Sequence, residues 1–116
     1  MARTVYKICP RELWREAEQN GRFAGAPVDL ADGFIHFSTA AQARETASKH
    51  FAGQAGLLLI GVDADRLGEA LRYEVSRGGA LFPHLYGTLG LDAVTSVEPL
   101  PLGADGAHIF PEMDSQ

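Results

Sequence analysis

The sequence contains a single cysteine, Cys9, so no disulfide can form within the chain. No run of apolar residues approaches the roughly 20 that a membrane-spanning helix needs. Residues 1–4 lead into a strand-like segment and lack the apolar core of a secretory signal. Together these absences predict a cytoplasmic protein with no membrane partner.

Positive charge is scarce as well. The chain has 10 Lys and Arg residues against 15 Asp and Glu residues, which gives a formal net charge of −5 at pH 7. It has no basic stripe and no Lys/Arg run of the kind that nucleic-acid-binding domains carry. The composition therefore predicts that DNA is not a partner of this protein.

Short motifs that would indicate a particular chemistry are also missing. No two histidines stand four residues apart and there is no paired-cysteine motif, so no metal site is predicted. Glycine-rich phosphate-binding loops and the Gly-x-Ser-x-Gly hydrolase motif are absent. Cys9 is followed by Pro10 and has no histidine near it in sequence, which favours a neutral, buried thiol over a nucleophile.

The residues that are present suit one modest core. A length of 116 residues with 46% hydrophobic residues predicts a single α+β domain over residues 1–111, followed by a tail at 112–116. The sheet is expected to be antiparallel or mixed, because most expected strands come late in the chain. Expected strands lie at 4–8, 34–37, 57–62, 71–76, 80–82, 93–97 and 108–110. Two main helices are expected at 11–20 and 40–52, a helical turn at 64–67, and a loop that borders a site at 22–31.

The stretch 32–39 carries the strongest local signals. Its segment 34–37 is rich in residues that favour a strand, and Thr39 with Gln42 has the pattern of a helix capping box. His36 would then stand just before a helix N-terminus, where backbone N–H groups favour anions. The alternative interpretation is an ordinary strand histidine with a local hydrogen bond, and a Thr39 that only caps the helix.

Two further groups of polar residues are candidates for a site. Glu74 shares one strand face with Arg72. A carboxylate on a strand is usually solvated, and an ion pair with Arg72 is another structural explanation for it. His84 and Tyr86 follow Pro83 in a segment that we expect to be an irregular corner. Held there, they would either line a pocket or belong to a packed corner.

Five segments together form a recognisable order along the chain. They are Val5-Tyr6-Lys7-Ile8, Asp32-Gly33-Phe34-Ile35-His36-Phe37-Ser38-Thr39, Leu57-Leu58-Leu59, Tyr73-Glu74 and Phe82-Pro83-His84-Leu85-Tyr86-Gly87. This order resembles the small bacterial proteins catalogued as domain of unknown function family 952. The resemblance covers nearly the whole chain, and it implies a class of protein without an established activity.

A more remote similarity links the layout to the ADP-ribosyltransferase superfamily, which includes RNA 2′-phosphotransferases. The segment 33–38 matches the second strand motif of that superfamily, with His36 at the position that stacks near nicotinamide. The segment 6–9 stands where tyrosine-histidine-glycine-threonine is usual, so Lys7 replaces the histidine that contacts the ribose. This similarity implies a split sheet of the ADP-ribosyltransferase type and a nucleotide-like ligand or NAD.

The same similarity implies a reaction and a set of catalytic residues. The expected reaction is transfer or hydrolysis at an anomeric ribose carbon, where Glu74 would stabilise the oxocarbenium-like charge. His36 or Tyr86 would stack on the leaving base or form a hydrogen bond with it. We expect His36, Glu74, His84 and Tyr86 to line one concave surface.

A phosphate of such a ligand would need positive partners. The residues expected to bind it are Lys7 or Arg72, with Ser38 and Thr39 at the helix N-terminus. The sequence is also compatible with two other functions. One is a non-catalytic binding or interaction module that kept the fold and lost the chemistry, and the other is a hydrolase that uses His36 and His84 as acid and base.

Overall fold

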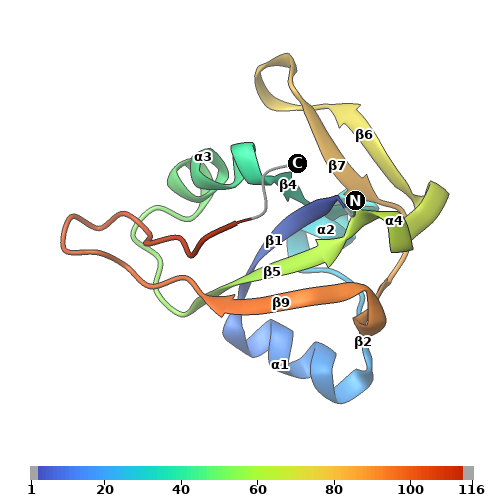
Figure 1. Cartoon of the computed structure of the whole chain (residues 1–116), viewed down its shortest axis with the longest axis horizontal. Helices are drawn as coiled ribbons and strands as arrows, with labels where there is room; N and C mark the ends of the chain where they lie inside the picture. The colour runs from blue at the N-terminus through green and yellow to red at the C-terminus, as the bar shows by residue number, and fades with distance from the viewer. Residues whose placement is uncertain (1–2, 114–116) are drawn as a thin grey trace.

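The computed structural model describes residues 3–113, apart from the side chain of residue 77. Within that range the strands pair antiparallel and form two sheets and one short ribbon (Figure 1). The first sheet contains, in spatial order, β4 (Ser38–Thr39), β1 (Thr4–Pro10), β5 (Leu57–Asp63) and β9 (Val94–Pro99). The second contains β3 (Ile35–His36), β7 (Leu81–Leu85) and β6 (Leu71–Val75), and the ribbon pairs β2 (Arg22–Phe23) with β8 (Leu89–Gly90).

Helices connect these strands. The α-helices of residues 3–113 are α1 (Arg11–Asn20), α2 (Pro27–Asp32), α3 (Ala40–His50) and α4 (Ala64–Leu67). Short 3-10 turns lie at Gly68–Ala70, Arg77–Gly79 and Leu91–Ala93. Helix α1 has the predicted bounds and stops at Gly21, whose φ of 82° suits a residue without Cβ. The mixture of helices with antiparallel sheets confirms the α+β class.

The two central strands of the first sheet, β1 and β5, are buried on both faces. Ile60 of β5 packs in one core cluster with Trp14 of α1, and the adjacent Leu59 packs in a second cluster with Ala47 of α3. Figure 1 shows the two helices on opposite sides of the sheet. Burial on both faces explains why 57–62 is continuously apolar, as predicted for a central strand.

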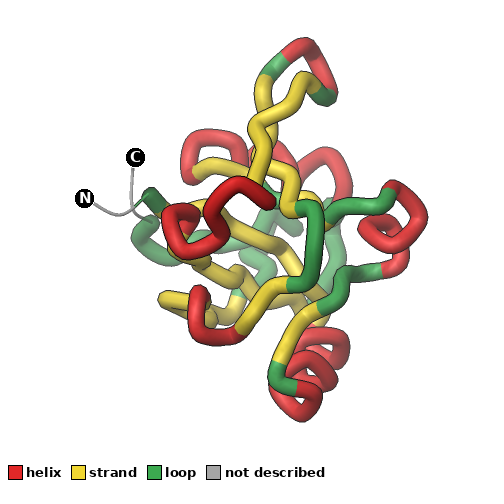
Figure 2. The backbone as a smooth tube through the Cα atoms, turned by 90° about the vertical axis from the view of Figure 1, so that its right-hand side faces the viewer, coloured by secondary structure: helices red, strands yellow, loops and turns green. Residues whose placement is uncertain are grey.

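In the second sheet, β7 lies between β3 and β6. Strands β6 and β7 form a hairpin that projects from the body of the molecule (Figures 1 and 2). Pro83 was expected to interrupt this strand, and His84 to lie in an irregular corner; both predictions were wrong. The strand continues through Pro83 because its carbonyl still accepts a hydrogen bond, from the N–H of Phe37 at 2.9 Å.

The predicted junction between strand and helix near Thr39 is confirmed. Helix α3 begins at Ala40 with Thr39 as the N-cap residue, and the side chain of Gln42 accepts a hydrogen bond from the Thr39 N–H at 3.1 Å. The single strand predicted at 34–37 is replaced by two short ones. Strand β3 pairs with β7 and β4 pairs with β1, because the chain crosses here from one sheet to the other.

Two other expectations differ from the structure. The segment 22–31 is not a loop, since it holds β2 and most of α2, and Pro27 occupies the first position of that helix. The strand predicted at 108–110 is reduced to an isolated bridge between Leu102 and His108. Other predicted bounds shift by a few residues.

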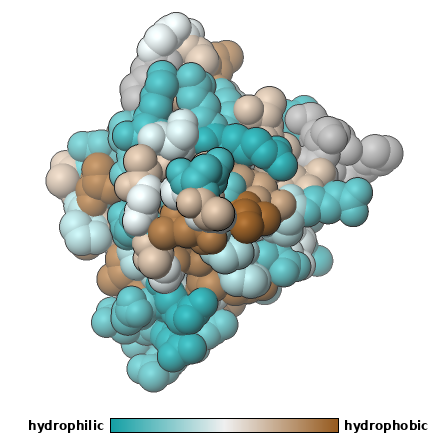
Figure 3. All heavy atoms as spheres, turned by 90° about the vertical axis from the view of Figure 1, so that its left-hand side faces the viewer, coloured by the Kyte–Doolittle hydropathy of each residue, from teal (hydrophilic) through white to brown (hydrophobic). Residues whose placement is uncertain are grey.

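The C-terminal segment covers one side of the molecule. Figure 3 shows apolar side chains at several places on the left-hand face of Figure 1, interspersed with hydrophilic ones. Met113 packs against the second core cluster, while the tail positions 114–116 lie outside the described residues. Over residues 3–113 no helix has both the length and the apolar character needed to cross a membrane.

Candidate functional site

Five of the predicted site residues share one face of the second sheet. His36 of β3 and Arg72 of β6 both lie directly opposite His84 of β7. Residues that are directly opposed point to the same face, and so do residues two positions apart along a strand. Glu74 lies two positions from Arg72, and Tyr86 two positions from His84, so strand register brings all five side chains together.

Aromatic rings pack closely on this face. The ring of Phe34 stacks on His84 with centroids 4.1 Å apart, and it lies 4.7 Å from His36 and 5.3 Å from Tyr86. The two histidine rings are 5.5 Å apart in an edge-on arrangement. The sequence indicated Phe34 only as a strand former; its alternation with His36 is the signal that could have placed it in the site.

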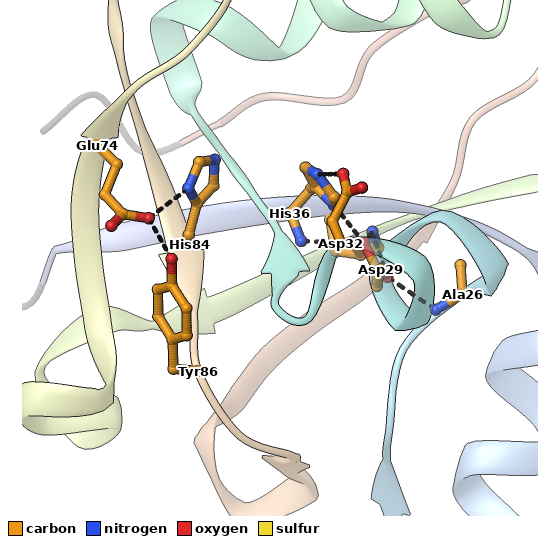
Figure 4. Close-up of polar contacts among 8 residues, drawn as sticks. Ala26, Asp29, Asp32, His36, Glu74, His84 and Tyr86 are labelled. Atoms are coloured by element: carbon orange, nitrogen blue, oxygen red, sulfur yellow. Dashed lines mark hydrogen bonds and ion pairs between the residues drawn. The ribbon is translucent and has the colours of Figure 1, made fainter.

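Glu74 is held by two neighbours. One oxygen, Oε1, accepts hydrogen bonds from Nδ1 of His84 at 2.8 Å and from the hydroxyl of Tyr86 at 2.7 Å (Figure 4). These two hydrogen bonds lower the pKa of Glu74, with a smaller contribution from the charge of Arg72. The bond to Glu74 raises the pKa of Tyr86, so the phenol stays protonated. The glutamate therefore remains an ionised acceptor.

His84 offers its second nitrogen to the surroundings of the site. Because an ionised carboxylate can only accept, the proton of a neutral His84 ring lies on Nδ1 and the lone pair lies on Nε2. Figure 4 shows this second nitrogen pointing away from Glu74. The residue is only 5% exposed, so Nε2 is a proton acceptor in a sheltered position.

Asp29 of α2 forms a second centre that the sequence did not indicate. It is 2% exposed, and its carboxylate lies 2.9 and 3.0 Å from the ammonium of Lys7. The N–H groups of Ala26 and His36 also donate to it, at 2.7 and 3.0 Å. Burial raises the pKa of Asp29, but the hydrogen bond from the His36 ring and the charge of Lys7 outweigh it and lower the pKa to about 2.

His36 lies between two carboxylates. Its Nδ1 is 2.6 Å from Oδ1 of Asp29, and its Nε2 is 2.9 Å from Oδ2 of Asp32 (Figure 4). Each ring nitrogen of His36 thus faces a carboxylate oxygen. His36 and His84 therefore have different electrostatic surroundings, although they are neighbours.

Local sequence explains how Asp29 reaches this position. Ala26 is the N-cap residue of α2 and Pro27 its first residue, so Asp29 stands at the third helical position and its side chain reaches back to the Ala26 N–H. A Cβ on Gly25 would come within 2.9 Å of the Asp29 side chain, which accounts for the glycine. Proline followed two residues later by an acid is the helix-start signal that could have identified this residue.

A pocket of about 510 Å³ opens beside the two histidines. Its wall combines apolar and aromatic side chains with neutral and charged polar groups. The lining residues are Tyr6, Lys7, Ile8, Val28, Asp32, His36, Phe37, Ser38, Thr46, His50, Phe51, Ser76, Phe82 and His84. Volumes of roughly 300–1,000 Å³ are typical of small-molecule sites.

The residues predicted to bind a ligand are placed differently from one another. Lys7 and Ser38 line the pocket, and the Ser38 hydroxyl lies 2.9 Å from that of Thr46. Thr39 and Arg72 do not belong to the pocket wall. The guanidinium of Arg72 instead lies over the ring of Tyr86, 5.1 Å from its centroid.

The lone cysteine lies apart from this chemistry. Cys9 is fully buried in β1, and burial raises the pKa of its thiol to about 11 although the charge of Lys7 lowers it. The neutral thiol fits the sequence-based prediction. Among residues 3–113 no group of three or more His, Cys, Asp or Glu side chains is arranged to hold a metal ion.

Comparisons with known proteins agree on the fold. A family model described as "Protein of unknown function (DUF952)" matches residues 8–97. The crystal structure of protein CC0527 from Caulobacter crescentus has 54% sequence identity, covers 91% of this chain and 93% of its own, and superposes with a TM-score of 0.88. A solution NMR structure of CC0527 gives 55% identity, 90% coverage of both chains and a TM-score of 0.82. No curated protein matches the sequence.

Proposed function

Because the chain belongs to the family described as "Protein of unknown function (DUF952)", we propose a function from the site itself. The pocket binds a nucleotide-like or NAD-derived ligand. Glu74 lies outside the pocket wall but is bound to His84 on that wall, and from there it acts at the anomeric carbon of the ligand's ribose. One observation carries this proposal: four rings are packed beside a hydrogen-bonded glutamate, and two of them line a pocket of about 510 Å³.

Binding would use the rings and the wall of the pocket. A flat heterocycle gains dispersion and stacking energy against aromatic rings, and His36 and His84 are the rings of this cluster that line the pocket. Apolar lining residues exclude water around the base, while a few polar groups fix its orientation. The pocket is large enough for a base with its ribose.

Glu74 and His84 have separate parts in the chemistry. When the bond between ribose C1′ and the base breaks, its electrons leave with the base and C1′ becomes oxocarbenium-like, which the Glu74 carboxylate stabilises. The oxygen of water or of an acceptor hydroxyl then bonds to C1′, and its proton passes to Nε2 of His84. His84 returns this proton to the departing base or, where the base leaves neutral as nicotinamide does, to solvent. Tyr86 keeps Glu74 in place through its hydroxyl.

We extend the proposal to the type of fold, an ADP-ribosyltransferase-like split sheet. Support comes from two sheets joined at the β3–β4 crossing and from a histidine-bearing strand that leads into α3. Lys7 stands where those enzymes use a histidine on the ribose, and its ammonium is bound to Asp29. General NAD hydrolysis is therefore expected to be slow, as measured by release of nicotinamide.

Calorimetry with NAD, ADP-ribose, nicotinamide and a panel of nucleosides and nucleotides tests the proposal. At least one compound should bind, and His84→Asn should weaken that binding by about tenfold, or about 1.4 kcal/mol. Asn keeps a polar group facing Glu74 and removes Nε2, so the sheet should remain folded. A substitution of His36 would test binding less specifically, because the ring of His36 also forms a hydrogen bond with Asp29.

His108→Asn is the matched control, since His108 lies outside the pocket wall and binds the carbonyl of Gln54. It should leave the affinity unchanged. If no compound binds the wild type, or if both histidine variants lose affinity equally, the proposed site is wrong.

The Lys7–Asp29 pair favours a second candidate, a non-catalytic binding or interaction module. Lys7, the cation expected to contact the ribose, is instead paired with the buried carboxylate of Asp29. A protein that kept the fold but lost the catalytic activity would be expected to show such a pairing. In that case a ligand binds with the same dependence on His84, and no product forms during prolonged incubation. Chromatography of the incubated mixture separates the two candidates.

A further inference from the structure

We propose that the pocket accepts the phosphate-free part of such a ligand, a nucleoside or a free heterocyclic base, and that its carboxylates disfavour phosphate groups. This inference rests on the proposed function, because it narrows the ligand class of the same pocket. It replaces the expectation that Lys7 or Arg72, with the helix N-terminus at Thr39, holds a phosphate.

The first argument is the commitment of Lys7. Within residues 3–113 it is the one Lys or Arg on the pocket wall, and its Nζ lies 2.9 Å from Oδ2 of Asp29. Both side chains are buried, with exposures of 7% and 1%. A phosphate could take this ammonium only by leaving Asp29 as a buried carboxylate without its counter-charge, which is strongly unfavourable.

The second argument is the negative charge around the rings. Asp32 lines the pocket, and together with Asp29 it brackets the ring of His36, so two carboxylates lie beside this ring. Glu74 lies outside the pocket wall, but it is bound to His84 on that wall and so adds a third carboxylate close to the pocket. A phosphate entering here would meet like charges at short range, whereas an uncharged sugar and base would not.

The other two groups that the sequence predicted to hold a phosphate lie outside the pocket wall. The N–H of Thr39 donates to the side chain of Gln42, and Thr39 is not part of the pocket wall. Arg72 is exposed and lies over the ring of Tyr86, also away from the wall. Neither group offers a charge to a ligand inside.

The pocket does offer neutral hydrogen-bonding groups. The hydroxyls of Ser38 and Thr46 lie 2.9 Å apart on its wall, and Ser76 is a third lining hydroxyl. Hydroxyls both donate and accept, which suits the hydroxyls of a ribose, and Nε2 of His84 can bond to the edge of a base. These groups complement a nucleoside.

Paired calorimetric titrations test the inference. Purine and pyrimidine nucleosides and nicotinamide riboside are each compared with their 5′-monophosphates at pH 7.5 and constant ionic strength. At least one nucleoside should bind, and its monophosphate should bind at least about tenfold more weakly.

The Asp32→Asn variant tests whether the carboxylates cause the weaker binding of the monophosphate. Asp32 is 48% exposed, so the substitution should not disturb folding, and it removes one negative charge from the pocket wall. The ratio between the two dissociation constants should fall to about threefold or less. Glu16→Gln on the exposed face of α1 changes the net charge equally and should leave that ratio unchanged.

The outcomes separate the two proposals. A monophosphate that binds as tightly as its nucleoside, or more tightly, overturns this inference and leaves the proposed function standing. Absence of binding by every nucleoside, monophosphate and NAD overturns both. If the ratio between the dissociation constants of the monophosphate and the nucleoside is unchanged in Asp32→Asn, the carboxylates do not cause the selectivity. That result overturns the inference.

Discussion

At the scale of single residues, Asp29 organises the charges of the site. Its two oxygens face the ammonium of Lys7, the N–H of Ala26, and both the ring and the N–H of His36. A buried carboxylate is tolerated when its charge is paired and its lone pairs are filled. Removal of one partner therefore leaves another group charged and unpaired inside the protein.

The first prediction concerns this pair. Asp29→Asn should lower the free energy of unfolding by about 3–5 kcal/mol, because Lys7 is left as a buried ammonium without a carboxylate. Lys7→Met should be similarly destabilising, and the double variant should lose about 1–3 kcal/mol less than the sum of the single losses. Urea denaturation followed by the fluorescence of Trp14 measures all three.

Glu18→Gln on α1 is the control for this cycle, since Glu18 is exposed and its loss should change stability by less than about 0.5 kcal/mol. If the losses of the two single variants simply add, Lys7 and Asp29 are not energetically coupled and the account of the pair is wrong.

At the scale of elements, Gln42 joins helix α3 to strand β7. Its Oε1 accepts from the N–H of Thr39 at 3.1 Å, and its Nε2 donates to the carbonyl of Leu81 at 2.7 Å. The same side chain thus caps the helix and ties the β6–β7 hairpin to it. This hairpin carries Glu74 and His84, so the contact bears on the geometry of the site.

Gln42→Ala should therefore lower the free energy of unfolding by about 1 kcal/mol, through loss of the cap and of the bond to Leu81. Thermal denaturation measures the change. Gln54→Ala is the matched control, because Gln54 is exposed and its bonds to Phe51 and His108 are made by its backbone N–H and carbonyl, which alanine keeps. Equal melting temperatures for the two variants would show that the Gln42 contacts contribute nothing.

At the scale of the whole molecule, stability should fall in acid. Asp29 has a pKa of about 2 in the folded protein against an ordinary value of 3.8, so the folded state binds fewer protons than the unfolded state in that range. This contribution, about 2 kcal/mol, is fully present above about pH 4 and is lost as the pH falls toward 2. Urea denaturation between pH 6 and pH 2.5 should show this loss of stability in the wild type. The Asp29→Asn variant should lose less stability over the same pH range.

Metal content is the second whole-molecule prediction. The purified protein should carry no stoichiometric zinc, because the carboxylates near His36 and His84 are used as hydrogen-bond acceptors and no suitable ligand spacing exists in the sequence. Elemental analysis by mass spectrometry checks this. About one zinc per chain, retained after dialysis against a chelator, would contradict it.

Much of the element order could be predicted from local patterns. The bounds of α1, the start of α3 after Thr39 and the central position of β5 follow from periodicity, capping residues and a continuous apolar run. Helix α2 was missed because its six residues are too few to show a helical period. Strand β7 was cut short because Pro83 usually excludes such a position.

The sequence by itself determined the composition of the core, the main elements and the residue types available for a site, because these depend on near neighbours in the chain. Only the tertiary structure decided that Lys7, Asp29 and His36 meet, since they come from three different elements. The pairing of His36 with His84 depends on the register between β3 and β7, which exists only because the chain changes sheets after His36. No local pattern encodes a register between distant strands, and so the site arises from the way the two sheets are joined.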